Sequence, residues 1–520
     1  MTRTWWIVAL LILLGTVRIA STWTTYAYTS DEPAHIACGM EWLDHGTYHY
    51  EDQHPPLARI AAALLPYLHG ARSKGLSNMS EEGSAIFDNA PVSLNLTLAR
   101  AGMLPFFWIA CLSLSWLARQ FCGVWNAVIA LALFSTLPPI LAHAGLATTD
   151  MALTSGMSSA LASLSFWVRK PSTGRAALLG VGIASAVGAK FSSLPFLPAA
   201  AAGLLLPLAL KNPARARDFL LRSKHLAQFA SALAVTALLV WALYRFSWGH
   251  VRGTGPLRPA PEFWAGIKTV RWHNRAGALS WLFGALSPRG FFWFYPVSLA
   301  LKSPLPWLLL VAAGVALGWR NLRMWSALGA ALGVLLVAMI FGHIDLGIRH
   351  ILPVYACLSV VAALGLNSLW ERRKTRVLAA ALGLWLAIGT ALAHPDYLPY
   401  FNELAGSRPE RILIDSDLDW GQDELRLEHR LAAAHATRVA LLSSASAPRG
   451  MELDPFSFDA PQAGWNAADI TPLTLRTAQA RQREPGRTFW FERMPAERIG
   501  KGILLWWVDP DPGDPRLQPH

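Results

Sequence analysis

Residues Ile351 to Trp370 read ILPVYACLSVVAALGLNSLW, a run that contains no charged side chain. Folded as an α-helix, a run of about 20 residues crosses the hydrocarbon core of a bilayer, which is about 30 Å thick. About ten more runs of this kind recur along the chain, so an all-α polytopic membrane protein with about 11 transmembrane helices is expected. The composition agrees, because 53% of the 520 residues are hydrophobic and only 15% are charged.

Positive charge gathers in the short connections between these apolar runs. The chain has 45 Lys and Arg against 33 Asp and Glu, a net charge of +12. Lysine and arginine concentrate on the cytoplasmic side of membrane proteins, where they face anionic lipid headgroups. We therefore expect the lipid bilayer as a partner, and no nucleic acid. The basic clusters are Arg169, Lys170 and Arg175; Lys211, Arg215, Arg217, Arg222 and Lys224; Arg320 and Arg323; and Arg372, Arg373, Lys374 and Arg376.

Placing the basic clusters on the cytoplasmic side fixes a topology. The block 176–210 is too long for one span, and Lys190 to Pro195 divides it into two helices with an outer turn. The N-terminus is then cytoplasmic, and long outer loops occupy about 24–97 and 248–296. The other expected spans are 5–23, 98–118, 124–141, 151–168, 226–247, 298–318, 325–342, 351–370 and 377–393.

Residues 395–520 follow the membrane domain, residues 1–394, and differ from it in composition. They are polar and proline-rich, with short apolar patches at Val439–Leu442 and Gly502–Val508. Apolar runs this short are typical of strands. We predict a small C-terminal α/β domain on the extracytoplasmic side, and we interpret the first apolar segment as a retained helix rather than a signal peptide.

Ionisable side chains collect on the outer side in this topology. Asp31 and Glu32 follow the first apolar segment at once, and charges beside a bilayer are costly unless they serve a cavity, a partner or chemistry. Asp150 lies in the next outer turn and Lys190 in the one after it. Arg349 and His350 directly precede the apolar run 351–370. A shared polar cavity on that face accounts for all of these positions.

These residue types indicate chemistry on a phosphate-linked substrate. One carboxylate of the pair Asp31 and Glu32 can accept a proton from a hydroxyl nucleophile. The guanidinium of Arg349 matches phosphate oxygens bidentately, and Lys190 and Lys302 can add point charges to the same anion. Together these groups predict a lipid-linked phosphate donor at the outer leaflet.

Each of these residues also has a purely structural interpretation. Asp31 can cap a helix, and Glu32 and His35 can be exposed loop residues. His54 stands before Pro55 and Pro56, and a proline restricts the residue that precedes it, so this stretch can be a rigid turn. Lysines 190 and 302 can extend toward the membrane interface, and Arg349 can anchor there. The sequence leaves these alternatives open.

One acidic stretch superficially matches a calcium loop. Asp415, Asp417 and Asp419 alternate before Trp420-Gly421. The glycine is one place late for that motif, and Arg426 stands where its last glutamate should be. We therefore do not expect calcium here.

Several motifs resemble one family. The chain combines Asp31-Glu32-Pro33-Ala34-His35 and His54-Pro55-Pro56-Leu57 with three later stretches, and with them it resembles bacterial membrane members of the protein O-mannosyltransferase and aminoarabinose-transferase-like (glycosyltransferase family 39-like) superfamily. These members are glycosyltransferases of GT-C architecture. The later stretches are Gly290–Pro296 with Lys302–Pro306, Gly347–Tyr355, and Tyr397–Gly406 with Asp415–Asp423.

The resemblance implies an integral membrane glycosyltransferase that moves a sugar, with inversion, from a polyprenyl-phosphate donor to a hydroxyl of a protein, lipid or glycan. It implies three catalytic acids: Asp31 as the base, Glu32 as its neighbour in acceptor or metal binding, and Asp150 as a second acidic position.

The remaining implied roles concern the substrate and a metal. The resemblance implies Lys190, Lys302 and Arg349 as contacts to the lipid phosphate. We also expect His35, His54 and His350 to be substrate-binding residues. A divalent cation, Mg²⁺ or Mn²⁺, on Asp31 and Asp150 is the one cofactor considered. The basic stretch Arg271–Arg275 departs from the family pattern and leaves the acceptor open.

The implied location is the bacterial inner membrane, with a multi-pass chain and a periplasmic C-terminal domain. A transporter or flippase for lipid-linked saccharides is the alternative, and it predicts ionisable groups at mid-membrane depth and interrupted helices in matching halves. A non-catalytic scaffold that presents the C-terminal domain is a third possibility, although it leaves the acidic pair unexplained.

Overall fold

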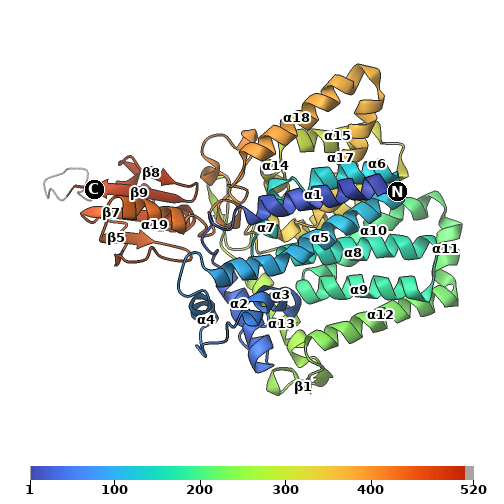
Figure 1. The fold of residues 1–520 in the computed structure, drawn as a ribbon, viewed down its shortest axis with the longest axis horizontal. Coiled ribbons are helices and arrows are strands. Elements are labelled where there is room, and N and C mark those ends of the chain that lie inside the picture. Colours follow the sequence, from blue (N-terminus) through green and yellow to red (C-terminus); the bar gives the residue numbers. More distant parts are fainter. Residues whose placement is uncertain (1, 510–520) are drawn as a thin grey trace.

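A bundle of helices and a small sheet domain at one end of it make up the computed structural model, which describes residues 2–509 (Figure 1). The long helices run side by side. The N-terminus and helix α11 (Pro213–Leu221), which carries part of the basic cluster 211–224, lie at the end remote from the sheet. The basic cluster 211–224 and the C-terminal domain, which the sequence assigns to opposite sides of the membrane, therefore lie at opposite ends of the bundle.

Within residues 2–509, seven helices are long and apolar enough to cross a membrane, and up to nine spans result if each of two bent pairs counts as one. The protein is thus an all-α polytopic membrane protein in its larger part. The seven are α5 (Leu94–Cys122), α8 (Asp150–Arg169), α10 (Ser193–Lys211), α12 (Ser223–Leu243), α16 (Leu322–Phe341), α17 (Val354–Glu371) and α18 (Arg376–Leu392), the last extended by a 3₁₀ turn at Arg373–Thr375.

Two shorter helices occupy the remaining expected spans. They are α1 (Thr2–Ala20) and α9 (Thr173–Ala189). The predicted division of the block 176–210 is confirmed, since α9 ends before Lys190 and α10 begins at Ser193.

The prediction of continuous helices over 124–141 and 298–318 was wrong. The first is bent by 69° between α6 (Val124–Phe134) and α7 (Pro138–Ala144), and the second by 113° between α14 (Phe294–Lys302) and α15 (Leu305–Leu317). Proline stands at each break: Pro138 and Pro139 open α7, and Pro304 precedes α15. Because proline cannot donate a backbone hydrogen bond and forces the preceding residue out of the helical region, the apolar run continues while the helix does not.

The two segments that the sequence predicts as long outer loops contain helices and hairpins, which the sequence did not predict. Residues 24–97 contain α2 (Glu32–Met40), continued by a π-helical turn at Glu41–His45, then α3 (Pro56–Leu68) and α4 (Met79–Ile86). Residues 248–296 contain the hairpin of β1 (Trp248–His250) and β2 (Leu257–Pro259), helix α13 (Pro261–Ala276), and the hairpin of β3 (Ser280–Leu282) and β4 (Ala285–Ser287).

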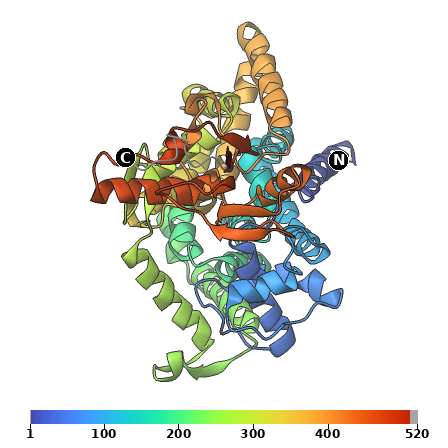
Figure 2. The ribbon, with the colours of Figure 1, turned by 90° about the vertical axis from the view of Figure 1, so that its left-hand side faces the viewer.

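The C-terminal part forms a small α/β domain, as expected, and Figure 2 views the molecule from the end that carries it. Its five-stranded sheet has the order β6-β5-β7-β9-β8, in which β5 is parallel to β6 and β7, and β9 is antiparallel to β7 and β8. Its core is aromatic, with Phe456, Trp490 and Trp506 buried together. The elements are α19 (Glu424–Ala433), β5 (Arg438–Leu442), β6 (Glu452–Pro455), β7 (Gly464–Asp469), α20 (Ile470–Arg483), β8 (Glu497–Ile499) and β9 (Ile503–Val508).

A linking segment, residues 395–423, runs between α18 and α19. Its three 3₁₀ turns are Glu403–Ala405, Pro409–Arg411 and Asp415–Asp417. Backbone hydrogen bonds tie it to the residues after α1, from Ala27 N to Gln422 O at 3.0 Å and from Ser30 N to Trp420 O at 3.1 Å. The linking segment therefore packs against the residues that lead directly to Asp31.

Candidate functional site

Asp31 and Arg349, which are 318 positions apart in the sequence, form the centre of the site. Asp31 lies at the start of α2, and its Oδ2 accepts a hydrogen bond of 2.8 Å from Arg349 Nη1. The Asp31 side chain is 38% exposed, whereas that of Arg349 is 9% exposed. Burial alone would raise the pKa of Asp31, but the charge and hydrogen bond of Arg349 act in the opposite direction, and the pKa lies below its usual range. Asp31 is therefore an ionised and accessible carboxylate at neutral pH.

Arg349 is positioned by the turn Ile348–Ile351 and by the linking segment. Its guanidinium carbon lies 4.0 Å from the ring centre of Trp420, and its Nη1 is 3.9 Å from Asp150 Oδ2. Burial opposes its charge, yet Asp31 and Asp150 raise its pKa above the ordinary value. Its buried Nε has no hydrogen-bond partner among residues 2–509. Nη1 of Arg349 thus lies near the carboxylates of Asp31 and Asp150, while its Nε–H is available to a further acceptor.

Asp150 and Lys190 form a second buried ion pair beside the first. Lys190 Nζ donates to Asp150 Oδ1 at 2.6 Å. Asp150 is the first residue of α8, and Lys190 follows the last residue of α9. The two helices approach closely at Gly156, where an added Cβ would lie 2.4 Å from Ala186 N. Small residues between α8 and α9 therefore set the distance between the two charges.

Glu32 is fully buried, and its side chain pairs with Arg100. Its two oxygens accept five hydrogen bonds, from Nε and Nη2 of Arg100, from the amide and hydroxyl of Thr29, and from the amide of Ala147. Arg100 is also fully buried, and it donates to the carbonyls of Tyr26 and Ala27. The pair joins α2, α5 and the turn before Asp150, so the contacts of Glu32 hold the site together rather than face a substrate.

His35 and His54 belong to a polar cluster around Arg59. Arg59 Nε donates to His35 Nδ1 at 3.2 Å, and Arg59 Nη2 is ion-paired with Glu51. His54 Nδ1 lies 3.2 Å from Glu51 Oε2, and the two imidazoles meet edge to face with ring centres 5.3 Å apart. Burial lowers the pKa of both histidines, and for His35 the charge of Arg59 adds to this effect. Both rings are therefore neutral at pH 7.

His350 and His143 carry unpartnered ring nitrogens. His350 Nε2 and His143 Nδ1 are buried without a hydrogen-bond partner among residues 2–509. Burial and the neighbouring Lys190 hold the pKa of His350 well below its usual range. With Arg349 Nε, these atoms make three unsatisfied nitrogens around the paired charges, and buried polar atoms normally find a partner.

Lys302 contacts the linking segment instead of the paired carboxylates. Its Nζ donates to Leu398 O at 2.8 Å and to Asp417 O, and it lies 4.3 Å from the ring centre of Phe401. The side chain of Asp417 accepts from Ile348 N at 2.9 Å, so Lys302 and Arg349 are joined through this segment. None of the hydrogen bonds of Lys302 within residues 2–509 is to Asp31 or Asp150.

Asp415 is a further acidic residue near Arg349 to which the sequence analysis gave no role. It has a left-handed backbone conformation (φ 59°). Burial raises its pKa to about 6, although Arg349 acts in the opposite direction. The alternation of acids in 415–419 was the available signal, and we interpreted it as a rejected calcium loop and as part of the family resemblance, without a role for Asp415.

The donor set fits a divalent cation poorly. Asp31 and Asp150 each contact a cationic side chain already. Within residues 2–509, no group of three or more His, Cys, Asp or Glu side chains is arranged to hold a metal ion. Arg349 and Lys190 therefore already neutralise the two carboxylates that a metal ion would need as ligands.

Neither a protein-family model nor a curated protein matches the chain. Solved structures do match it. ArnT from Cupriavidus metallidurans in the apo state is 17% identical, with a TM-score of 0.51, over 76% of this chain and 66% of ArnT. ArnT from the same organism bound to undecaprenyl phosphate is 13% identical, with a TM-score of 0.50, over 96% of this chain and 97% of that one.

A third structure is the archaeal oligosaccharyltransferase AglB from Archaeoglobus fulgidus in complex with an inhibitory peptide and a dolichol-phosphate. It is 14% identical, with a TM-score of 0.45, over 92% of this chain and 71% of that one. The similarity to ArnT shows that this chain has the GT-C fold. This is the fold that the resemblance of its sequence motifs predicts.

Proposed function

We propose that the protein is an inverting glycosyltransferase that moves a sugar from a polyprenyl-phosphate donor to a hydroxyl acceptor. The observation that carries this proposal is the contact of an accessible, ionised Asp31 with a buried Arg349 that retains an unpartnered N–H. A carboxylate that can accept the proton of a hydroxyl thus lies beside a cation that can bind a phosphate. The GT-C fold supports the proposal, since ArnT with that fold has been captured with undecaprenyl phosphate.

The proposed reaction is a single displacement. The acceptor oxygen attacks the anomeric carbon, and the bond from that carbon to the phosphate oxygen breaks with both electrons leaving on the phosphate. Asp31 takes the proton of the acceptor hydroxyl, an effect worth about 10²- to 10⁴-fold in rate. Negative charge that develops on the leaving phosphate is stabilised by Arg349, because a preorganised cation in a buried site acts most strongly on developing charge.

The other site residues bind the donor or position Asp31 and Arg349. Lys190 and His350 lie beside Asp150 and Arg349, and we assign them to the donor phosphate and sugar, with Asp150 holding Lys190 in place. We assign His35 and His54 to the wall behind Asp31. Glu32 and Lys302 act as positioning residues, the first through Arg100 and the second through the linking segment.

We place the reaction on the periplasmic face of a bacterial inner membrane. The support is that the site lies at the end of the bundle that carries the sheet domain, while the basic cluster around α11 lies at the other end (Figure 1). The acceptor is a protein, lipid or glycan hydroxyl. A divalent cation on Asp31 and Asp150 would have to displace Arg349 or Lys190, so we propose that the charge on the phosphate is balanced by side chains.

Transfer from a panel of radiolabelled polyprenyl-phosphate sugars tests the proposal in membranes that carry wild type or Asp31→Asn. We expect wild type to transfer the label from one donor, and Asp31→Asn to lose turnover by 10²-fold or more while it still binds that donor. Arg349→Ala should lose both binding and turnover. Equal, small effects of the two substitutions would rule out these roles.

A transporter of lipid-linked saccharides is the second candidate, because two helix pairs are broken, α6–α7 and α14–α15. Interrupted helices are characteristic of transporters. The paired charges described here, however, lie where helices begin and end rather than at the middle of a span. Movement of a labelled donor across the bilayer of a vesicle, without transfer to any acceptor, would favour this candidate.

A further inference from the structure

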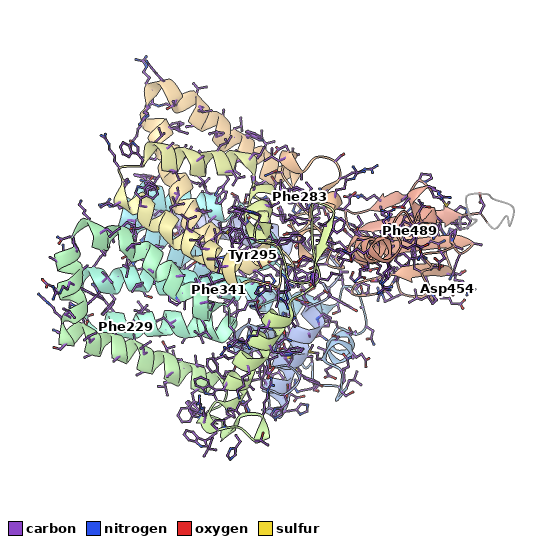
Figure 3. The ribbon with its side chains drawn as sticks, turned by 180° about the vertical axis from the view of Figure 1, so that it is seen from behind. Phe229, Phe283, Tyr295, Phe341, Asp454 and Phe489 are labelled. Carbon is purple, nitrogen blue, oxygen red and sulfur yellow. The ribbon has the colours of Figure 1, made fainter. Side chains whose placement is uncertain are left out.

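A groove of about 1040 Å³ lies between the β3–β4 hairpin and the C-terminal sheet domain. Figure 3 labels Phe283 in the hairpin and Phe489 in the sheet domain, the two parts of the chain between which the groove lies. The hairpin contributes Trp281, the linking segment contributes Arg408 and Arg411, and the sheet domain contributes Thr477 and Trp506. Pockets for drug-sized ligands occupy about 300–1,000 Å³, so this groove is larger than one sugar unit needs.

The groove carries excess positive charge. Two of its four arginines are paired, Arg481 with Glu492 at 2.6 Å and Arg498 with Glu410 at 2.9 Å. The exposed Arg408 and Arg411 form no ion pair among residues 2–509, and both also line an adjoining hollow of about 510 Å³. Free guanidinium groups bind carboxylate and phosphate oxygens bidentately, so the groove is suited to an anion.

Hydrogen-bonding atoms in the groove wall point to a hydroxyl-rich ligand. Trp506 Nε1, Thr477 Oγ1 and Glu410 Oε2 are buried without a hydrogen-bond partner among residues 2–509. The first can only donate, the carboxylate oxygen can only accept, and the hydroxyl does both. A ligand that satisfies all three must itself donate and accept, as sugar hydroxyls do. The half-buried ring of Trp281 offers an apolar surface to the carbon face of a sugar.

One stretch of chain connects the groove to the catalytic cluster. The turn Pro409–Arg411 contributes Glu410 and Arg411 to the groove. Asp415 follows Arg411 by four positions and Trp420 by nine. Trp420 stacks on Arg349, and the amide of Asp415 donates to Thr471 Oγ1 of α20 at 2.9 Å. An acceptor bound in the groove therefore lies along the segment that positions Arg349.

We propose that this groove binds the acceptor, and that the acceptor is an anionic saccharide chain, with uronate or phosphate groups held by Arg408 and Arg411. This inference rests on the proposed glycosyl transfer, since it names the substrate that receives the sugar. Binding to the groove nevertheless does not require the chemistry at Asp31.

The test measures binding of fluorescent hexagalacturonate to the full-length protein in neutral-lipid nanodiscs, with maltohexaose as the neutral probe. The key variant is Arg408→Ala/Arg411→Ala. The matched control is Arg476→Ala, an exposed arginine of α20 that does not line the groove. Loss of a hydrogen bond to a charged group costs about tenfold in affinity, so we expect the double variant to bind at least tenfold more weakly and the control to bind like wild type.

Arg349→Ala separates this inference from the proposed reaction. Retention of hexagalacturonate binding by Arg349→Ala supports a groove distinct from the donor site, whether or not any transfer is observed. Absence of binding to wild type, equal binding of the neutral probe, or an unaffected double variant would overturn the inference. Tighter binding of a polyglutamate peptide than of hexagalacturonate would also overturn it, because the occupant would then be an acidic protein segment.

Discussion

The Glu32–Arg100 ion pair gives the sharpest test of how the site is built. Both side chains are fully buried, and the pair connects α2 to α5. Removal of one partner from a buried pair costs about 3–5 kcal/mol, because the remaining charge has no counter-ion. The amides of Ala147 and Thr29 bond to different oxygens of Glu32, and Glu32→Gln keeps only one of them as an acceptor, so the expected loss is at least about 3 kcal/mol.

The assay is thermal unfolding of the purified protein in detergent. Glu32→Gln should lower the apparent Tm by at least about 6 °C, given that each kcal/mol moves the Tm of a large domain by about 2 °C. The double variant Glu32→Gln/Arg100→Gln should recover much of that loss, since its two neutral amides leave no unpaired charge. Glu81→Gln, an exposed carboxylate of α4, is the matched control and should not change the Tm.

Activity of the same variants separates a positioning role from a catalytic one. If Glu32 only holds α2 in place, the double variant should transfer sugar at a permissive temperature at a rate close to that of wild type. A Glu32→Gln protein with the Tm of wild type would refute the stability argument. If that protein were also inactive, Glu32 would take part in the chemistry.

Three further predictions follow from the charges. Lys190→Ala should raise the KM for the donor about tenfold while Lys190→Arg retains most of the affinity, as measured by initial rates. Treatment with EDTA should leave transfer unchanged, because Asp31 pairs with Arg349 and not with a metal ion. Loss of activity that Mn²⁺ restores would contradict this pairing. Burial raises the pKa of Glu424 from 4.5 to about 8, so the folded state binds more protons and stability falls as the pH rises through this range. Glu424→Gln should therefore raise the Tm at pH 9 and leave it unchanged at pH 4; equal Tm values at pH 9 would disprove the shift.

The membrane helices could be predicted because hydropathy alone determines them. Each expected span corresponds to a helix or a bent pair, and the split at Lys190 was visible as a polar interruption of an apolar run. The two breaks were missed because they lie within apolar runs. A proline in such a run is compatible with a kinked span as well as with two helices, and packing against neighbours decides between them.

The charged residues of the site could be located singly but not paired. Asp31, Asp150, Lys190 and Arg349 stand out because ionisable groups near a membrane face need a reason. Their pairing depends on which helix ends meet, and this is tertiary information. Arg100 was overlooked although the same rule applies to it, since an arginine inside an apolar helix requires a buried partner.

The linking segment shows why a division of this chain at residue 394 describes composition better than it describes the site. Trp420 covers Arg349, and the carbonyl of Asp417 holds Lys302. Backbone bonds also join this segment to Ala27 and Ser30, on the approach to Asp31. The aromatic ring that covers the guanidinium of Arg349 therefore comes from beyond residue 394. The sheet domain therefore begins directly after the segment that carries Trp420, so under the proposed function an acceptor held in the groove lies along the same stretch of chain that covers Arg349.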